Sequence, residues 1–281
     1  MSGTLYVVAT PIGNLEDITL RALRVLREVD VIAVEDTRRT ARLLNHHAIS
    51  TRTISFHAHN ARARVPLLIS RLQGGSSVAV VTDAGTPGIS DPGLELVEAA
   101  ISKGIAVDPV PGASAPLTAL VASGFPLVPF TLFGFPPNRS KARSAWLEDV
   151  CTTQHVFSFF EAPHRIRATL IEAEPLLGFR PIVVAREITK VHQEFIRGTA
   201  VELLQRLGEP RGEFTVVVGP PLKQNKNNQL TSSDDEVVHE FWRLTELTGA
   251  SRREAIRLVA QGSGRSTKDV YSAIERAKKL V

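Results

Sequence analysis

Cysteine, methionine and net charge are all scarce in this sequence. Its 281 residues include one Cys and one Met, and 33 basic residues outnumber 29 acidic residues only slightly, for a net charge of +4. A lone cysteine, Cys151, excludes an intramolecular disulfide and any zinc or iron–sulfur site built from several cysteines. The first residues also lack the basic-then-apolar pattern of a secretory signal. We therefore expect a protein of the reducing cytoplasm.

The sequence has no uninterrupted apolar run that suits a membrane-spanning helix. Residues 109–138 carry no charge, but they contain seven prolines. A spanning helix needs about 20 mostly apolar residues and an unbroken backbone hydrogen-bond ladder, and prolines at this density break that ladder. We expect this stretch to form a buried junction between two domains, and we expect no membrane association.

The common nucleotide-binding and hydrolase motifs are missing as well. There is no G-x-x-x-x-G-K-[ST] phosphate loop, no G-x-G-x-x-G after a strand, no H-E-x-x-H and no G-x-S-x-G. Phosphate-loop hydrolases, simple dehydrogenases, zinc proteases and serine hydrolases are therefore disfavoured. No cluster of potential metal ligands stands out in the sequence, so we expect no metal.

Acidic residues are absent from positions 37–82, where seven arginines and four of the eight histidines lie. Arginine suits bidentate contacts to phosphate, so this segment favours a polyanion-binding face. A general preference of the proteome for arginine is the alternative for the chain as a whole, which has 25 Arg and 8 Lys. The residues expected on this face are Arg38, Arg39, Arg42, His57, Asn60, Arg62 and Arg64.

Short apolar runs alternate with helical patterns in the first half of the chain. Strands are predicted at 5–9, 31–34, 76–82 and 105–110. Helices are predicted at 19–29, 37–44 and 92–103, with Ser90 or Asp91 as the cap of the last one. This alternation predicts a parallel sheet with helices on its faces.

The second half predicts a mixed sheet, because its last three strands are separated by only one helix. Strands are expected at 130–135, 155–161, 181–186, 194–198 and 213–219, and helices at 165–177 and 200–207. We predict an α/β domain over 1–114, a second over 115–221, and a helical module over 235–281 after a polar linker. In this module, Ser251 with Glu254 and Ser266 with Asp269 form capping boxes on either side of a turn at 261–264. This pattern is similar to a helix-turn-helix.

Three loops rich in Gly and Pro follow predicted strands of the first domain, at 9–15, 81–93 and 110–116. Ligands of open α/β sheets bind at the carboxyl ends of the strands, and glycines there allow close approach of the backbone to a ligand. Any one of these loops alone is read as an ordinary turn, but three at one edge predict a site. Its expected lining is Pro11, Gly13, Asn14, Asp83, Ala84, Gly85, Thr86, Pro111, Gly112, Ala113 and Ser114.

These loops and several later segments carry a family resemblance. The segments are LYVVATPIGNLEDITLRA, AVEDTRRT, VVTDAGTPGISDPG, VPGASA, FEAPHRI and AREITKVHQEF. Together they resemble the tetrapyrrole-methylase-like (class III) S-adenosylmethionine-dependent methyltransferases, over about residues 4–219. Within that superfamily they are similar to the branch that methylates ribose 2′-hydroxyls of 16S rRNA.

The resemblance implies two α/β domains with S-adenosylmethionine in the cleft between them, and a homodimer. It also implies a cytidine of 16S rRNA, in the small ribosomal subunit, as the substrate. The small-molecule branch has a G-G-D-P type loop where this chain reads Asp83-Ala84-Gly85-Thr86-Pro87, which favours the RNA branch. A small-molecule methylase of the same fold and a ligand-sensing helix-turn-helix regulator are the alternatives.

Methyl transfer to a hydroxyl needs in-line alignment, and a general base assists it. Carboxylates and a lysine near the ends of predicted strands are the candidates, although the sequence does not single out the base. They are Glu35, Asp36, Glu187 and Lys190. Glu161 and His164 also follow a strand, but cap or packing roles are at least as plausible for them.

Overall fold

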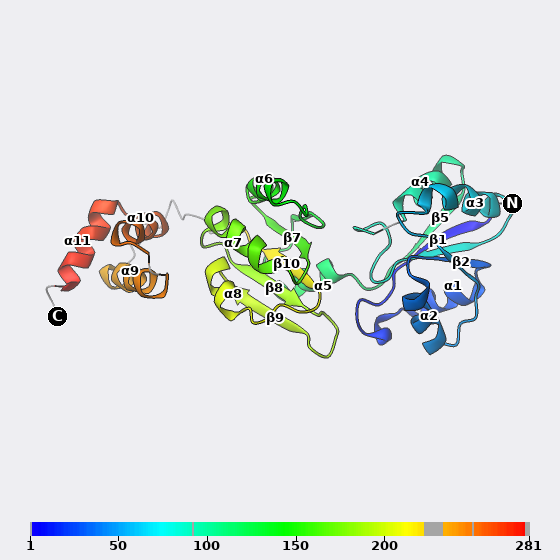
Figure 1. Ribbon diagram of the computed structural model, residues 1–281, viewed down its shortest axis with the longest axis horizontal. Coiled ribbons are helices and arrows are strands. Elements are labelled where there is room, and N and C mark those ends of the chain that lie inside the picture. The colour runs from blue at the N-terminus through cyan, green and yellow to red at the C-terminus, as the bar shows by residue number, and fades with distance from the viewer. Residues whose placement is uncertain (1, 92, 222–232, 249, 279–281) are drawn as a thin grey trace. The chain divides into compact units, whose positions relative to one another are not determined.

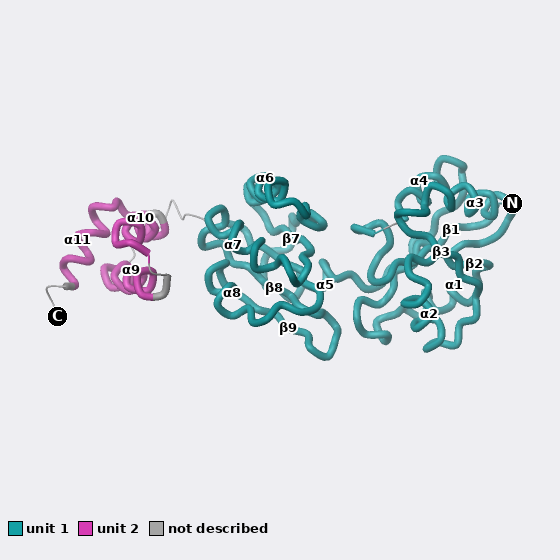
Figure 2. Tube along the Cα trace, in the orientation of Figure 1, with its two compact units in different colours: residues 1–221 teal, residues 222–281 magenta. Residues whose placement is uncertain are grey.

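The structure is a computed structural model that describes residues 2–91, 93–221, 233–248 and 250–278. Its contacts divide the chain into two compact units, Met1–Pro221 and Leu222–Val281 (Figure 2). The first unit contains two five-stranded sheets, and the second is helical where it is described (Figure 1). None of the helices in the described parts of the chain is long and apolar enough to cross a membrane.

The first sheet is parallel throughout, in the order β3-β2-β4-β1-β5. Its strands are β1 (Thr4–Val8), β2 (Val31–Val34), β3 (Thr53–Ser55), β4 (Val78–Val81) and β5 (Ala106–Val110). Every residue of β2 and β4 is buried, because helices cover both faces of the sheet. One face packs against α1 (Leu20–Glu28) and α2 (Thr37–His46), and the other against α3 (Ala61–Gln73) and α4 (Leu94–Ser102).

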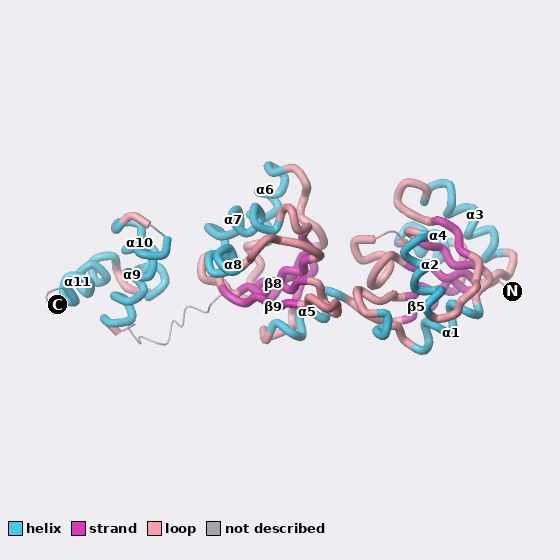
Figure 3. The backbone as a smooth tube through the Cα atoms, turned by 60° about the horizontal axis from the view of Figure 1, so that its bottom comes forward, coloured by secondary structure: helices cyan, strands magenta, loops and turns pink. Residues whose placement is uncertain are grey.

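The second sheet is mixed, in the order β6-β7-β10-β8-β9, with only β6 and β7 parallel. Its strands are β6 (Phe130–Leu132), β7 (Val156–Glu161), β8 (Ile182–Arg186), β9 (Glu194–Gly198) and β10 (Phe214–Val218). One face packs against α6 (Ser140–Val150), α7 (Ile166–Leu177) and α8 (Ala200–Arg206), and the other against α5 (Ala115–Ser123). Figure 3 shows these strands between α5 and the other three helices.

A buried arginine ties together one end of this second sheet. Arg180 is 6% exposed, and its guanidinium donates to the carbonyl oxygens of Cys151, Thr153, His155 and Gly219 at 2.5–3.2 Å. These carbonyls lie just before β7 and just after β10. Four acceptors and the face of the Phe157 ring, 5.2 Å from the guanidinium carbon, compensate for the loss of hydration of the charge.

The second unit has its own small core. Its helices are α9 (Asp234–Thr248), α10 (Arg252–Ser263) and α11 (Thr267–Lys278), which contact one another. Phe241, Val259 and Ile274 are among its buried side chains. Ser251 caps α10 by accepting from the Glu254 amide, and Ser266 accepts from the Asp269 amide while its hydroxyl donates to the Asp269 carboxylate. Most of the expected linker, including 223–232, lies outside the described residues, as do residue 249 and the last three residues.

Three α-helices, one strand and a short 3₁₀ helix (Leu15–Asp17) of the first unit are absent from the sequence-based prediction: α3, α5, α6, β3 and η1. Pro66 lies inside α3 and a proline occupies the first turn of α5, and both obscure helical periodicity. In α6, Arg143 takes a buried position that a periodic pattern would give to an apolar residue. Its charge is accommodated by Glu172 of α7, with the two side chains 2.5 Å apart.

Three expectations are wrong, about the burial of one segment, the cap of one helix and the position of one turn. Residues 109–138 are not a wholly buried junction, because α5 exposes Val121 (69%) and the following loop exposes Val128 (91%). Helix α4 is capped by Gly93, whose φ of 139° suits only glycine, rather than by Ser90 or Asp91. The turn expected at 261–264 is part of α10, which continues to Ser263 and ends at a left-handed Gly264.

Candidate active site

The three Gly/Pro loops meet at one edge of the first sheet because β1, β4 and β5 are parallel neighbours. Thr10 and Gly85 exchange backbone hydrogen bonds of 2.8 and 3.0 Å, which join the first two loops. The third loop is joined through Ala9, whose amide donates to the carbonyl of Val110. A Cβ on Gly112 would lie 2.9 Å from the Cβ of Ala9, so glycine is needed for this close approach. The loops thus form one continuous wall.

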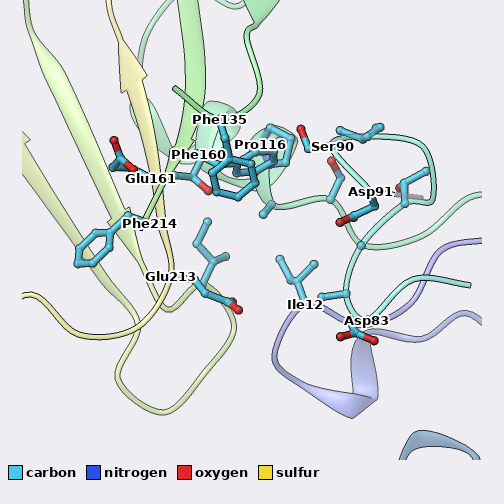
Figure 4. A pocket seen from close by; sticks show the side chains of 18 of the residues that line it. Ile12, Asp83, Ser90, Asp91, Pro116, Phe135, Phe160, Glu161, Glu213 and Phe214 are labelled. Carbon is cyan, nitrogen blue, oxygen red and sulfur yellow. The ribbon is translucent and has the colours of Figure 1, made fainter. Parts of the chain in front are cut away.

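A cavity of about 410 Å³ lies between this wall and the second sheet (Figure 4). Its size is in the range of small-molecule sites, roughly 300–1,000 Å³. The first domain and the start of α5 line it with Ile12, Glu35, Arg39, Asp83, Ala84, Gly85, Thr86, Ile89, Ser90, Asp91, Ser114, Ala115 and Pro116. The second sheet and its loops line it with Phe135, Phe160, Glu161, Ala162, Pro163, Ile188, Glu213, Phe214 and Thr215.

The two sheets are brought together beside the cavity by a contact at Gly13. A Cβ on Gly13 would lie 2.5 Å from Cγ of Lys190 and 2.7 Å from Oγ1 of Thr189. Next to it, the amide of Asn14 donates to the Thr189 hydroxyl at 3.1 Å. Thr189 has a left-handed backbone, with φ of 67°, a conformation that costs energy for a threonine. The loop after β8 is therefore shaped to meet the loop after β1.

A second contact between the two halves of the first unit lies at Gly134, in the loop after β6. A Cβ on Gly134 would lie 3.1 Å from the hydroxyl of Ser90, in the loop after β4. Ser90 also has a positive φ, 63°. Backbone strain at such positions is commonly stored where function needs it, and here both strained residues lie where the cavity walls meet.

Acidic side chains of the first domain are fixed by backbone amides. Asp83 accepts from the amide of Asp36 at 3.0 Å and lies 3.5 Å from the guanidinium of Arg39. Glu35 accepts from the amide of Asp83 at 3.3 Å. Asp36 caps α2 by accepting from the amides of its first turn. The carboxylates of Glu35 and Asp83 thus fix the ends of β2 and β4 relative to each other, and that of Asp36 fixes the start of α2.

Asp91 differs from these acids. No residue in the described part of the chain donates a hydrogen bond to its carboxylate or forms an ion pair with it. Burial, together with the nearby carboxylates of Glu35 and Asp83, raises the pKa of Asp91 to about 6. Figure 4 shows its carboxyl group on the cavity side.

An ion-pair group from the second sheet borders the cavity. The ammonium of Lys190 lies 2.9 Å from a carboxylate oxygen of both Glu187 and Glu213. Burial alone would lower the pKa of Lys190, but the two carboxylates raise it above its ordinary value. Burial alone would raise the pKa of Glu187, but bonds from Lys190 and from the amide of Glu213 hold it below its ordinary value. Lys190 and Glu187 are therefore charged near neutral pH.

Comparison with known proteins now identifies the family. Residues 4–204 match the family model of the Tetrapyrrole (Corrin/Porphyrin) Methylases. The chain is 45% identical to the ribosomal RNA small subunit methyltransferase I of Halalkalibacterium halodurans, over 96% of this chain and 94% of that protein. It is 40% identical to the protein of the same name from Synechocystis, over 96% of each. The chain belongs to the tetrapyrrole methylase family. It is a methyltransferase.

A solved methylase structure shares the fold. The uroporphyrin-III C-methyltransferase of Thermus thermophilus, complexed with S-adenyl homocysteine, is 19% identical to the chain. It covers 77% of this chain and 97% of its own length, with a TM-score of 0.55. The expected fold class, two α/β domains followed by C-terminal helices, is confirmed.

The residues expected to bind the methyl donor divide into two groups in this methylase. Asp83, Ala84, Gly85, Thr86 and Ser114 line the cavity. Pro11 instead lines a smaller hollow of about 70 Å³ beside it. Gly13 and Asn14 contact the loop after β8, and Gly112 packs against Ala9. Pro111 and Ala113 are not among the lining residues either. Several of these residues thus pack the loops together, and which of them contact the donor stays a prediction.

The catalytic candidates also take different positions. Glu35 lines the cavity, whereas Asp36 caps α2. Glu187 and Lys190 stand behind Glu213, which is the member of their ion-pair group that lines the cavity. Which of them takes part in catalysis stays a prediction.

The expected polyanion-binding residues lie on and beside α2 and α3. Arg38, Arg39 and Arg42 are exposed on α2, and Arg39 and Arg42 also line the smaller hollow. Asn60 uses its side chain within its own loop, accepting from the amide of His57 and donating to Ser55. Arg62 is exposed and Arg64 is half-buried on α3. Arg39 joins this face to the cavity.

The sequence-based site lacks the aromatic wall and Asp91. The ring centroids of Phe135, in the loop after β6, and Phe160, near the end of strand β7, are 5.1 Å apart. Beside them, Glu161 is 1% exposed and is bound by the hydroxyl of Thr169, the amide of Ala162 and the guanidinium of Arg165. A pattern did point here: residues 160–163 span the end of a predicted strand and belong to a segment that carries the family resemblance.

Proposed function

We propose that the chain transfers a methyl group from S-adenosylmethionine to a ribose 2′-hydroxyl of a cytidine in 16S rRNA. The observation that carries this proposal is the 45% identity with a ribosomal RNA small subunit methyltransferase I over nearly the whole of both chains. The cavity and the arginine-rich face beside it support it. The assembled small subunit, rather than free RNA, is the proposed substrate.

The cavity suits the donor in size and in lining. The wall formed by Ala84, Gly85, Thr86 and Ala115 is small-residue backbone, which can present amides and carbonyls to an adenosyl group and an amino-acid group. Ile12 and Ile188 give apolar cover. The bound donor supplies a methyl group on a positively charged sulfur; the chain's task is to align it with the acceptor oxygen.

The acceptor RNA is proposed to enter over α2. Arg38 and Arg42 are exposed there and Arg39 reaches the cavity, so the phosphates near the target would be held within reach of the donor. Phe135 is 54% exposed at the cavity and is backed by Phe160. A nucleobase turned out of its stack would find an aromatic surface there.

We also propose that the protein works as a homodimer in the cytoplasm, where ribosomal subunits are. Four large apolar side chains of the first unit support an interface: Leu117 and Val121 on α5 are 51% and 69% exposed, and Val128 and Val191 are 91% and 97% exposed. Light scattering combined with size-exclusion chromatography tests this. A monomer at micromolar concentration would contradict it.

The helical unit is proposed to contact rRNA that flanks the target. Arg252, Arg253, Arg257 and Lys268 are exposed on α10 and α11. The guanidinium of Arg252 lies 5.4 Å from the centroid of the half-exposed Tyr271 ring. Arginine and tyrosine together suit phosphate contacts and base stacking.

Ribose methylation mapped by mass spectrometry in 16S rRNA, from cells with and without this protein, tests the function. Loss of one 2′-O-methyl group from a cytidine, restored by the purified protein and S-adenosylmethionine, is expected. Transfer of tritium from labelled donor to a tetrapyrrole but not to small subunits would favour the small-molecule alternative. Donor binding with transfer to neither would contradict both.

A further inference from the structure

Among the carboxylates that line the cavity, Asp91 is the one without an assigned structural partner in the described chain. Glu35 and Asp83 accept from backbone amides. Glu213 is paired with Lys190, and Glu161 is bound by three groups and almost completely buried. A carboxylate that already accepts such bonds is stabilised as an anion, and this stabilisation makes it a weaker base.

The position of Asp91 suits a group that meets the acceptor. It follows Ser90, whose hydroxyl is at the contact with Gly134, and the next residue of that loop is the exposed Phe135. Asp91 and Phe135 therefore lie on the two loops that meet at this side of the cavity (Figure 4). A nucleotide whose base contacts Phe135 would carry its ribose close to Asp91.

We propose that Asp91 accepts the proton of the ribose 2′-hydroxyl during methyl transfer, an assignment that rests on the proposed function. The 2′-oxygen forms a bond to the methyl carbon as the bond from that carbon to sulfur breaks. The electron pair of the broken bond stays on sulfur, which becomes a neutral thioether. The proton of the hydroxyl passes to the Asp91 carboxylate, and its electron pair stays on the oxygen. The neutral Asp91 then releases the proton to water.

The charges around Asp91 agree with this role. Burial, together with the carboxylates of Glu35 and Asp83 at the ends of β2 and β4, raises the pKa of its carboxyl to about 6. Arg39 of α2 is the cation on that side, and it lies beside Asp83. Glu161 and Glu213 line the cavity from the second sheet. With a pKa of about 6, Asp91 is ionised at pH 7.5 but is a stronger base than an ordinary aspartate.

Single-turnover methylation of purified small subunits, at saturating donor, tests the assignment in the full-length protein. The unaltered protein should gain rate as the pH rises through about 6 and then reach a plateau, because only ionised Asp91 accepts a proton. Asp91→Asn should lower the plateau rate by roughly 10²–10⁴-fold and abolish the rise. Asp91→Glu should restore part of the rate. Formate added to Asp91→Ala should restore activity that it does not restore to Asp91→Asn, which has no space for it.

The matched control is Asp149→Asn on α6, which neutralises an exposed aspartate outside the cavity and should leave rate and profile unchanged. Donor affinity, measured by calorimetry, should be the same in Asp91→Asn as in the unaltered protein. Weaker donor binding with a normal plateau rate would overturn the assignment and show that Asp91 holds the donor's ammonium. A full rate in Asp91→Asn would overturn it outright. If the unaltered protein methylates no ribose in the small subunit, the proposed function fails and this role fails with it.

Discussion

The parallel and the mixed sheet of the first unit supply different chemistry to the same cavity. The parallel sheet brings three loops to one edge, and much of what it presents is backbone at small residues such as Ala84 and Gly85. The mixed sheet presents side chains, with the Phe135–Phe160 ring pair and the Lys190 ion pairs. The backbone groups suit the donor and the aromatic pair suits the base of the acceptor, whose ribose and phosphates are proposed to meet Asp91 and the arginines of α2 on the parallel side. Substitutions on each side can break or sharpen that division.

Among the changes that test this division, the largest effect is expected on donor affinity, from Gly85→Val on the parallel side. Gly85 has φ of 81° and carries both bridge hydrogen bonds to Thr10, and it lines the cavity. A valine side chain would intrude on the adenosyl group and should weaken donor binding by roughly tenfold or more, a loss of about 1.4 kcal/mol. Calorimetric titration with S-adenosylmethionine measures this.

The matched control is Gly88→Val in the same loop. Gly88 has φ of 86°, so the backbone strain is similar, but no other heavy atom lies within 4 Å of the added Cβ. Both variants should lose about 1–2 kcal/mol of stability to strain. Only Gly85→Val should lose donor affinity. Equal affinity losses in the two would mean that strain, and not occlusion, is responsible.

Next comes the double substitution Arg38→Ala with Arg42→Ala. It should weaken binding to small subunits several-fold and flatten its dependence on salt, by roughly 0.7 in the log–log slope for each phosphate that is no longer neutralised. Donor affinity should stay unchanged. Filter binding at several salt concentrations is the measurement. The control is the double substitution Arg24→Ala with Lys103→Ala, which removes the same charge from other exposed positions of this domain. If that control pair flattens the slope equally, the face on α2 has no special role.

A smaller, selective effect is expected from deleting residues 223–281. The four cores of the first unit contain no residue beyond Val218, so the truncated protein should fold and bind donor normally. Methylation of assembled subunits should fall a few-fold more than methylation of a short RNA fragment. Parallel loss of thermal stability and donor binding would show instead that the helices only support the catalytic unit.

The smallest effect is expected from Lys190→Met, which tests the mixed side. At pH 7 it should cost about 0.5–1 kcal/mol of stability, because two carboxylates lose an ion-pair partner that is partly exposed to solvent. The pKa of Glu187 is held below its ordinary value in the folded protein. Its ion pair therefore contributes fully to the stability of the fold above the ordinary pKa, and this contribution is lost as the pH falls through the lowered pKa of the folded state. The variant should therefore be closest to the unaltered protein at acidic pH. Urea unfolding at pH 7 and pH 4 measures this, and a constant difference would contradict it.

The parallel side could be predicted from the sequence because its signals are local. Runs such as 31–34 are buried on both faces, and Gly/Pro loops follow their carboxyl ends. Such loops must share an edge in a parallel sheet, so the location of the cavity followed without any long-range information. The alternation does not show which loop residues face the ligand, since packing of Gly13 against Lys190 depends on a contact across 177 residues of chain.

For the mixed sheet, the sequence predicted the strands but not how their side chains pair at the cavity. Glu213 and Lys190 are 23 positions apart, and their pairing depends on where β8 and β10 meet. The sequence predicts a cap role for Asp91 because Asp before a helical pattern usually caps it. Gly93 takes that place here, since a φ of 139° is open to glycine. The loop shape thus frees Asp91, and no local pattern contains that information.

The Arg180 contacts have a consequence for measuring motion in this protein. They fasten the end of β7 and β10 that is remote from Phe160 and Glu213, and one of the carbonyls they hold belongs to Cys151. Burial raises the pKa of the Cys151 thiol to about 11, so at neutral pH it is almost entirely protonated and reacts slowly with alkylating reagents. As the lone cysteine, it can report on local opening, because its rate of labelling depends on how often this end of the sheet opens. Comparing the labelling rates with and without S-adenosylmethionine would show whether a ligand in the cavity reduces opening at the opposite end of the same two strands.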